Sequence, residues 1–437
     1  MARKFIHHRQ LSKNMIQKEI VITGMGLLSP IGNDLDTFWE ALCEGRSGVS
    51  IVETFDSGHA PLFGCVAPDI RAKDFVKPRK NIKNMSRDIQ LGYIASLHAI
   101  ENAGLTVNCE SPSIDPDRLG IVFGSDLIGL ELDELVDAFN VCKIDDRIEF
   151  PRWGADALPK IFPLWMLKYL PNLVAGQLAI AIDARGPNNT VTLRRSSSLS
   201  AITEAVRTIE RGQADIMICG GVGNRANPIF LARGKTYHLA PTTGDPTEQP
   251  RPYDADRMGT VLGEGSGTLI IESRETAEAR RAKPFARIVG FAQAFEPALY
   301  TTPITGQSIR QAIRKALQDA DCKPEDLSHV NADGLGAIWE DRAEAQAIRD
   351  ELGDIPVTAP KGHFGDLGGG SGTVELIASL IGLQKGLIPP TRNFVTPDPN
   401  CPVNVVHGTP QSCEKTRFLK INNTRAGRSN AIVIEKI

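Results

Sequence analysis

One stretch of the chain has the form that enzymes use to present a reactive side chain. Residues 186–202 begin with a Gly-Pro-Asn turn, continue as a short β-branched strand from Thr190 to Leu193, and then open a helix with small residues. A tight strand-to-helix turn holds one side chain at a helix N-terminus, where unpaired N–H groups and the helix dipole favour negative charge. The side chain at this place is Arg195, a permanent cation with no nucleophilic atom.

Three serines follow the arginine and could offer a substitute nucleophile. Ser196, Ser197 and Ser198 stand directly after Arg195. A serine needs a base, usually a histidine, to take its proton, and small residues are needed for helix entry in any case. We therefore interpret the serines as structural and keep a catalytic Ser196 as the alternative.

The elements that must position this turn follow a repeated order. Strand patterns alternate with helical patterns over most of the chain, which predicts a layered α/β protein with largely parallel sheets. The charged residues 273–283 form the best boundary, so we expect two halves, 18–275 and 276–437, after a flexible leader at 1–17. A stretch rich in Trp, Pro and Leu at about 128–172 suits a cap over a pocket or a subunit interface.

Composition excludes several classes of function. The 437 residues carry a net charge of -3, which gives no electrostatic case for nucleic acid or an anionic membrane. No run of about 18 apolar residues is long enough to span a membrane. The eight cysteines are scattered without a C-x-x-C pair, so we expect reduced thiols and a cytoplasmic protein.

Two other motifs suggest ligands but favour structural roles. Gly24-Met25-Gly26 follows a strand, yet no third glycine opens a helix, so a packed turn is preferred over a dinucleotide site. Asp254, Asp256 and Glu264 could suggest a metal, but no Cys/His cluster accompanies them. We expect neither a metal nor a cofactor.

Several segments resemble the β-ketoacyl-acyl-carrier-protein synthases, in the same order and at plausible spacings. The resemblance covers roughly residues 18–437 and implies the thiolase-like αβαβα fold, with two similar halves and chains usually paired as dimers. The matching segments are Lys18 to Asn33, Gly186-Pro187-Asn188, Ala214-Asp215 with Gly220-Gly221, Arg251 to Gly267, Val330-Asn331-Ala332, Lys361 to Gly365, and Ser429-Asn430-Ala431.

The chain departs from the family at the positions that carry its chemistry. In the family a cysteine accepts the acyl chain and two histidines assist decarboxylation of the malonyl thioester. Aligned on the motifs, these positions fall on Arg195, Asp333 and Asp366. The threonines that hold the carrier's pantetheine arm become Leu335 and Ala337, and the family's Gly-Phe-Gly-Gly loop reads Arg425 to Arg428, with Ala426 inside it.

These replacements make physical sense together. Burying an arginine without a counter-ion costs roughly several kcal/mol. Two carboxylates can remove this cost, because they accept hydrogen bonds from the guanidinium N–H groups on two sides. We therefore expect Arg195, Asp333 and Asp366 to form an ion triad that fills the former site. The family's buried pair survives as Lys361 and Glu375, and we expect His363 to pack or face solvent rather than reach the site.

Two functions follow from the resemblance. The first is a ketosynthase-like subunit that does not condense, similar to the chain-length-factor subunits of type II fatty-acid and polyketide systems. Such a chain forms a homodimer, or a heterodimer with a catalytic ketosynthase, and an acyl carrier protein is a possible partner. The alternative is an acyl-transfer or decarboxylating enzyme with altered chemistry, in which Asp333 or Asp366 is the base and Arg195 an anchor.

Overall fold

The computed structural model describes residues 18–52, 62–68, 70–131, 133–231, 238–298 and 303–437. The predicted leader at 1–17 lies outside the described residues. Most strands join one long sheet with the order β14-β12-β11-β16-β17-β10-β1-β9-β8-β4-β7. This sheet consists of two halves that meet where β1 pairs with β10, over Ile20–Ile22 and Ala286–Ile288.

The two halves repeat one pairing pattern. Outward from the junction, each half has two antiparallel pairs followed by parallel pairs, two in the N-terminal half and three in the C-terminal half. In the N-terminal half the strands are β1 (Ile20–Leu28), β9 (Leu262–Ser273), β8 (Ile216–Asn224), β4 (Leu119–Ser125) and β7 (Asn188–Thr192). In the C-terminal half they are β10 (Ala286–Phe295), β17 (Arg428–Lys436), β16 (Arg417–Asn423), β11 (Leu327–Asn331), β12 (Pro356–Thr358) and β14 (Asn404–Val405).

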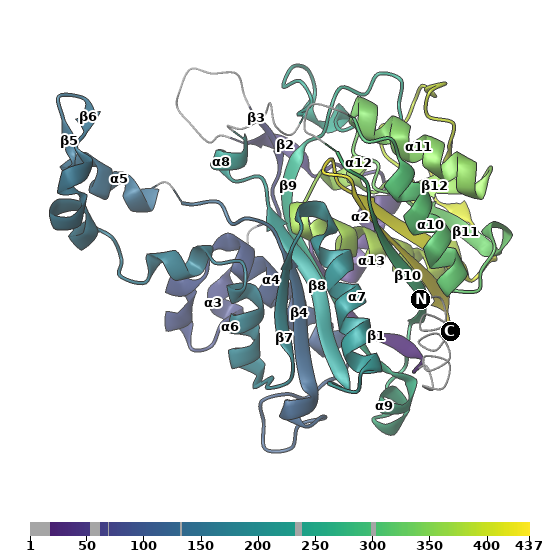
Figure 1. The fold of residues 1–437 in the computed structure, drawn as a ribbon, viewed down its shortest axis with the longest axis horizontal. Coiled ribbons are helices and arrows are strands. Elements are labelled where there is room, and N and C mark those ends of the chain that lie inside the picture. Colours follow the sequence, from purple (N-terminus) through teal and green to yellow (C-terminus); the bar gives the residue numbers. More distant parts are fainter. Residues whose placement is uncertain (1–17, 53–61, 69, 132, 232–237, 299–302) are drawn as a thin grey trace, which may run out of the picture.

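Helices cover both outer faces and fill the space between the halves. Two of them, α7 (Ser197–Glu210) and α13 (Ser371–Lys385), are almost wholly buried and pack against each other in the middle layer. On one outer face lie α4 (Arg87–Asn102) and α6 (Leu173–Ile182), and on the other lie α10 (Gln307–Asp319) and α11 (Ile338–Leu352), as Figure 1 shows. This is the layered αβαβα architecture with two similar halves.

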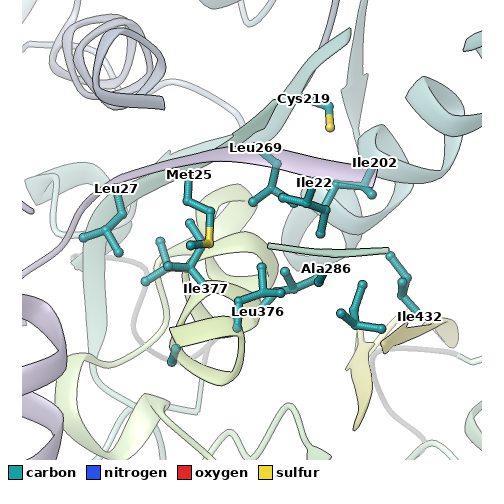
Figure 2. Packing of buried hydrophobic residues seen from close by; sticks show 14 of the residues in the cluster. Ile22, Met25, Leu27, Ile202, Cys219, Leu269, Ala286, Leu376, Ile377 and Ile432 are labelled. Carbon is teal, nitrogen blue, oxygen red and sulfur yellow. The ribbon is translucent and has the colours of Figure 1, made fainter. Parts of the chain in front are cut away.

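The middle layer owes its stability to apolar packing from both halves. Figure 2 shows Met25 of β1 close to Ile377 of α13, and both belong to one buried cluster with Leu269 of β9 and Leu376 of α13. Burying apolar surface stabilises the fold by roughly 25 cal/mol per Å², so this layer fixes the two helices that carry the site. Their N-termini cannot move independently of the core.

The prediction of largely parallel sheets is wrong in part. Along this strand order the strands nearest the junction pair antiparallel, and the parallel pairs lie among the outer strands of each half. Off this order, β3 (Leu62–Cys65) pairs parallel with the start of β9. Long crossovers through helices do connect the parallel strands, as expected for such pairs. β9 is the next strand of the long sheet after β8 in the sequence, and β17 is the next after β16, and each of these two pairs is antiparallel. The alternation of strand and helix patterns in the sequence did not predict these antiparallel pairs.

Gly24-Met25-Gly26 is not a turn but the middle of β1. A Cβ at Gly24 would lie 2.5 Å from the Ala99 carbonyl oxygen, and one at Gly26 would lie 2.3 Å from the Ala95 carbonyl oxygen. The glycines therefore let α4 lie directly on the strand. The motif is a packing device, and the dinucleotide interpretation has no support.

Residues 128–172, which we call the arm, extend from the body of the molecule at the left of Figure 1. The arm contains α5 (Asp133–Val141) and the hairpin of β5 (Lys143–Ile144) and β6 (Arg147–Ile148), followed by short helical turns. Leu135, Ala138 and Ile161 belong to a small core of its own. The stretch rich in Trp, Pro and Leu is thus a unit with a small apolar core and a regular hairpin.

The shorter elements connect these layers. They are α2 (Leu35–Cys43), β2 (Val49–Val52), β3 (Leu62–Cys65), α3 (Ala72–Phe75), α8 (Pro228–Leu231), α9 (Arg274–Ala279), α12 (Lys361–Phe364), β13 (Leu387–Ile388) and β15 (Gln411–Ser412).

Candidate functional site: a buried ion cluster

The site begins at the expected turn between β7 and α7. Arg194 has φ +57, a left-handed conformation that is uncommon for a residue with a Cβ, and it reverses the chain at the end of the strand. Ser197 fixes the turn, because its Oγ accepts from the Leu193 N–H at 2.8 Å and donates to the Ser125 carbonyl oxygen at 2.9 Å. The strand predicted over Thr190 to Leu193 begins two residues earlier and ends one residue earlier, at Asn188–Thr192.

The neighbouring serines lack the partners that activate a nucleophile. Ser196 and Ser198 are buried, and among the described residues the Oγ atom of each has no hydrogen-bond partner. A Cβ at Gly372 of α13 would lie 2.7 Å from the Ser198 Oγ. Small residues at both positions therefore let α7 and α13 approach each other. No described base contacts the Ser196 hydroxyl, which leaves the catalytic alternative without geometric support.

Arg195 points into the protein and lies between the two predicted aspartates. It is 8 % exposed, its Nε is 3.5 Å from the Asp333 Oδ2, and its Nη1 is 3.4 Å from the Asp366 Oδ2. Its Nε also donates to the Asn423 carbonyl oxygen at 3.3 Å, whereas its Nη2 has no partner among the described residues. Burial lowers the pKa of Arg195, but the charges of Asp333 and Asp366 outweigh it and hold the pKa above the usual value.

Asp366 has a closer partner than Arg195. Arg225, which follows β8, donates from Nη1 to the Asp366 Oδ2 at 2.5 Å, and its Nε and Nη2 reach the Asp126 Oδ2 at 2.9 and 2.6 Å. The Gly368 N–H donates to the other Asp366 oxygen at 3.0 Å. Burial opposes ionisation of Asp366, but Arg225 and then Arg195 outweigh it, so the pKa of this carboxyl lies below its usual range.

Asp333 is held from the opposite side by the retained lysine. Lys361 Nζ donates to the Asp333 Oδ1 at 2.9 Å, and the Asn422 amide donates to the same oxygen at 2.7 Å. Lys361 also pairs with Glu375 of α13, and Lys420 of β16 pairs with the second oxygen of that carboxylate. Burial lowers the pKa of Lys361, but Asp333 and Glu375 outweigh it and raise the pKa above the usual value.

The charges form one balanced cluster rather than a triad. Each ion in it has at least one oppositely charged neighbour within 4.0 Å. Its cations are Arg195, Arg225, Lys361 and Lys420, and its anions are Asp126, Asp333, Asp366 and Glu375. Paired charges cost far less to bury than isolated ones. The cluster stabilises its own charges and presents no soft nucleophile among these eight residues.

The other predicted positions surround this cluster at different depths. Leu335 and Ala337 are buried in the loop between β11 and α11, where the Leu335 N–H donates to Asp341 at 2.9 Å. Ala426 is exposed on the turn between β16 and β17, which closes by a bond from the Gly427 N–H to the Thr424 carbonyl oxygen at 2.8 Å. The structure therefore brings Arg195, Asp333, Asp366, Lys361 and Glu375 together and leaves Ala426 at the surface.

The nearby histidines are committed to packing. His363 is buried in α12 with its ring nitrogens 3.1 Å from the Arg46 carbonyl oxygen and 3.0 Å from the Pro390 carbonyl oxygen, and burial lowers its pKa to about 4. His329 lies between Ser328 and Ser379 at 2.8 Å from each hydroxyl, and burial lowers its pKa to about 3. His363 packs, as expected, and its ring contacts the Arg46 and Pro390 carbonyl oxygens rather than Arg195.

Asp254 and Glu264, two of the carboxylates that could suggest a metal, instead hold loops. Asp254 accepts from the Val395 and Thr396 N–H groups at 2.7 Å, and Glu264 pairs with Arg87 at 2.8 Å and accepts from the Ala67 N–H at 3.1 Å. Within the described residues no group of three His, Cys, Asp or Glu side chains could hold a metal ion.

Sequence reasoning missed three of the eight residues of the cluster, Asp126, Arg225 and Lys420. Asp126 and Arg225 directly follow β4 and β8, whose carboxyl ends lie at the same edge of the sheet. Because ligands bind at the carboxyl ends of strands in α/β proteins, a polar residue directly after such a strand is a candidate site residue. Lys420 carried another signal, because it is a cation inside the apolar strand Phe418 to Ile421.

Comparison with known proteins identifies the family. The β-ketoacyl synthase N-terminal domain matches residues 17–277, and the β-ketoacyl synthase C-terminal domain matches residues 285–395. The chain belongs to the β-ketoacyl synthase family. A 3-oxoacyl-[acyl-carrier-protein] synthase 2 of Synechocystis sp. is 35% identical over 402 residues, which cover 90% of this chain and 92% of the relative. One of Vibrio cholerae is 32% identical over 430 residues, covering 97% and 100%.

Solved structures show the same ketosynthase fold over almost the whole chain. A β-ketoacyl synthase from Burkholderia phymatum superposes with a TM-score of 0.85 at 25% identity, covering 96% of this chain and all of the other. The ishigamide ketosynthase/chain length factor superposes with a TM-score of 0.82 at the same identity and coverage. Among the described residues of this ketosynthase homologue, no helix combines the length and apolarity that crossing a membrane requires.

Proposed function

We propose that this chain is a ketosynthase-fold subunit that does not condense and that pairs with a catalytically active β-ketoacyl synthase. The observation that carries the proposal is the position of Arg195, whose guanidinium lies within 3.5 Å of both Asp333 and Asp366. By the family resemblance these are the positions of the cysteine and the two histidines. A guanidinium does not attack a thioester, and carboxylates repel a malonyl anion and cannot donate to a developing enolate.

The altered-chemistry alternative receives less support from the geometry. A general base must reach a substrate proton and must have a pKa near the working pH. Asp366 has a pKa below its usual range and is occupied by Arg225, the Gly368 N–H and Ser371. Asp333 is bonded to Lys361 and Asn422. Both carboxylates therefore serve as counter-ions for buried cations.

The arm and the edge of the sheet supply a surface for pairing. β7 ends the order of the sheet and, among the described strands, pairs with β4 alone. α6 packs beside it and exposes Ile180 at 71 %. The arm adds ten exposed large apolar side chains, a density that favours burial in an assembly. They are Val136, Phe139, Ile144, Phe150, Leu158, Phe162, Leu164, Met166, Leu167 and Leu170.

In the proposed assembly the partner ketosynthase catalyses the condensation. The ketosynthase partner provides the acyl-accepting cysteine, while this chain supports the partner's acyl tunnel and offers a surface to an acyl carrier protein. A structural neighbour is described as a type II PKS acyl-carrier protein in complex with its ketosynthase. That description supports an acyl carrier protein as a partner of the pair. The scattered cysteines, which we expect to be reduced, favour the cytoplasm as the place of the assembly.

Affinity purification of the tagged chain from its native cell tests the proposal. We expect a cysteine-bearing ketosynthase to copurify in equal amount, and the reconstituted pair to condense malonyl and acyl groups carried on the acyl carrier protein. Replacing the partner's cysteine should abolish condensation, whereas Arg195→Lys in this chain should not. Recovery of this chain as a self-pair that condenses without a partner would overturn the proposal.

A further inference from the structure

Lys420 is a fully buried cation in the middle of β16, between apolar neighbours. Its Nζ donates to the Asn331 Oδ1 at 2.9 Å, to the Ala332 carbonyl oxygen at 3.2 Å and to the Glu375 Oε2. An ammonium group has three N–H donors and no acceptor, so these three oxygens use all of its donors. The group is held in one place and has no donor left for a ligand.

The oxygens around the Lys420 ammonium group are fixed by the elements that carry them. Asn331 is the register partner of Lys420 on the parallel strand β11. The Asn331 amide donates to the Glu375 carbonyl oxygen at 2.6 Å and to the Ser379 Oγ at 2.7 Å, which leaves its Oδ1 for Lys420. Glu375 and Ser379 lie one turn apart on α13. The place of the ammonium group is therefore built into the contact between β11, β16 and α13.

Lys420 and Asp333 lie at opposite ends of one row of buried charges. Lys361 uses its three N–H groups for the Glu375 Oε1, the Asp333 Oδ1 at 2.9 Å and the Asp333 carbonyl oxygen at 3.0 Å. Glu375 thus lies between two ammonium groups, and Lys361 lies between two carboxylates. Without Lys420, Glu375 and Asp333 would share one cation, and burying the excess negative charge would be costly.

The charge of Lys420 balances the replacements at the former reaction site. By the family resemblance, an uncharged cysteine and two uncharged histidines have become Arg195, Asp333 and Asp366. These replacements add one cation and two anions, which leaves one negative charge in excess. Four other charges of the cluster form two neutral pairs. They are Asp126 with Arg225, and Lys361 with Glu375. Lys420 therefore supplies the positive charge that makes the whole cluster neutral.

We infer that Lys420 is a positioning residue that neutralises the excess negative charge and so keeps Asp333 ionised beside Arg195. It acts through Glu375: because Lys420 pairs with this carboxylate, the charge of Lys361 remains available to Asp333. The inference goes beyond the proposed function, because it concerns the isolated chain. Stability of that chain tests it, whereas pairing and condensation test the proposed function, so each can fail alone.

Thermal unfolding of the purified full chain, of Lys420→Met, of Asp333→Asn and of the double variant tests the inference. Lys420→Met keeps an apolar stem of similar length but removes the charge, and should lower Tm by about 5 °C or more. Asp333→Asn should lower Tm in the unmodified chain but raise it in the Lys420→Met chain, because the double variant is again neutral. Lys315→Met, at an exposed position, is the control and should leave Tm unchanged.

A second set of variants applies the same test at the former reaction site. Arg195→Cys, Asp333→His and Asp366→His together restore the uncharged residues of the family's site. This triple variant has one buried cation in excess, so it should melt at a lower temperature than the unmodified chain. Adding Lys420→Met removes the excess and should raise the Tm of the triple variant.

Three results would overturn the inference. Lys420→Met melting at the same temperature as the unmodified chain would show that the charge is not needed. Asp333→Asn lowering Tm equally in both backgrounds would show that the two charges act independently. A triple variant whose Tm does not rise with Lys420→Met would show that Lys420 does not balance the site. If Lys420→Met alone does not fold, a folded double variant supports the inference and an unfolded double variant contradicts it.

Discussion

At the scale of single residues, the contacts of Arg195 are the weakest in the ion cluster. Its ion-pair distances are 3.4 and 3.5 Å, whereas Arg225 approaches Asp366 to 2.5 Å and Lys361 approaches Asp333 to 2.9 Å. The aspartates thus have primary partners other than the residue at the cysteine position. Asp366 is the anion that holds Arg225 and Arg195 together.

Asp366→Asn should therefore destabilise the protein strongly. The variant removes the carboxylate that neutralises the buried guanidinium groups of Arg225 and Arg195, and breaking a buried ion pair costs about 3–5 kcal/mol. Urea denaturation at pH 7 measures the loss. Asp350→Asn, which removes one partner of a partly exposed pair with Arg310, is the control and should cost under about 1 kcal/mol. Equal losses in the two variants would contradict the importance of the buried cluster.

The two arginines should differ in the same measurement. Arg195→Met keeps an apolar stem of similar length and leaves Asp366 paired with Arg225 and Asp333 paired with Lys361, so we expect a loss below about 2 kcal/mol. Arg225→Met leaves Asp126 and Asp366 without their closest cation and should cost about 3–5 kcal/mol. A larger loss for Arg195→Met would reverse the ranking given by the distances.

At the scale of elements, the helices and strands were largely predictable and the cluster only partly so. Apolar residues at helical spacing predict helices over Ser308–Ala320 and Thr373–Lys385. The structure has α10 at Gln307–Asp319 and α13 at Ser371–Lys385, because apolar periodicity marks buried faces directly. The place of Arg225 after β8 marked it as a candidate site residue, but its contact with Asp366 was not predictable, since it joins residues 141 positions apart. Periodicity carries no information about which strand ends meet.

The arm should contribute to pairing and little to the stability of the single chain. Phe150→Asp with Met166→Asp places charges on side chains that are 68 % and 62 % exposed. We expect the unfolding free energy of the isolated chain to change by under about 0.5 kcal/mol, as for other surface substitutions. Its affinity for the ketosynthase should fall by about tenfold or more because charged groups would be desolvated in the interface.

Analytical ultracentrifugation of the mixed chains measures this affinity. Ile437→Asp, an exposed apolar position outside the arm, is the control and should pair normally. Unchanged pairing in the double variant would remove the arm from the interface.

At the scale of the whole molecule, two buried histidines set an acid limit on stability. Burial lowers the pKa of His363 to about 4 and that of His329 to about 3, whereas a histidine in the unfolded chain has a pKa of about 6.5. Below pH 6.5 the unfolded chain therefore binds protons that the folded chain does not. The stability from the neutral rings is fully present above about pH 6.5 and falls as the pH decreases towards 4.

The loss should be about 1.4 kcal/mol per pH unit for each ring within this window. Buried carboxyls contribute with the opposite sign, since burial raises the pKa of Asp341 to about 7, so the total slope does not isolate the rings. Urea unfolding of the unmodified chain and of His363→Gln between pH 6 and pH 4.5 isolates this ring, and the two slopes should differ by about 1.4 kcal/mol per pH unit. Equal slopes in the two proteins would contradict the burial of a neutral His363.

Intact-mass spectrometry of the purified chain after incubation with acyl- and malonyl-carrier protein tests the central claim most directly. Because Arg195 replaces a thiol and its neighbours are carboxylates, we expect no acyl adduct on this chain and no release of CO2. The paired ketosynthase in the same tube should carry the acyl group on its cysteine. An acyl group bound to Ser196, or to any other residue of this chain, or CO2 release by the chain alone, would contradict the account.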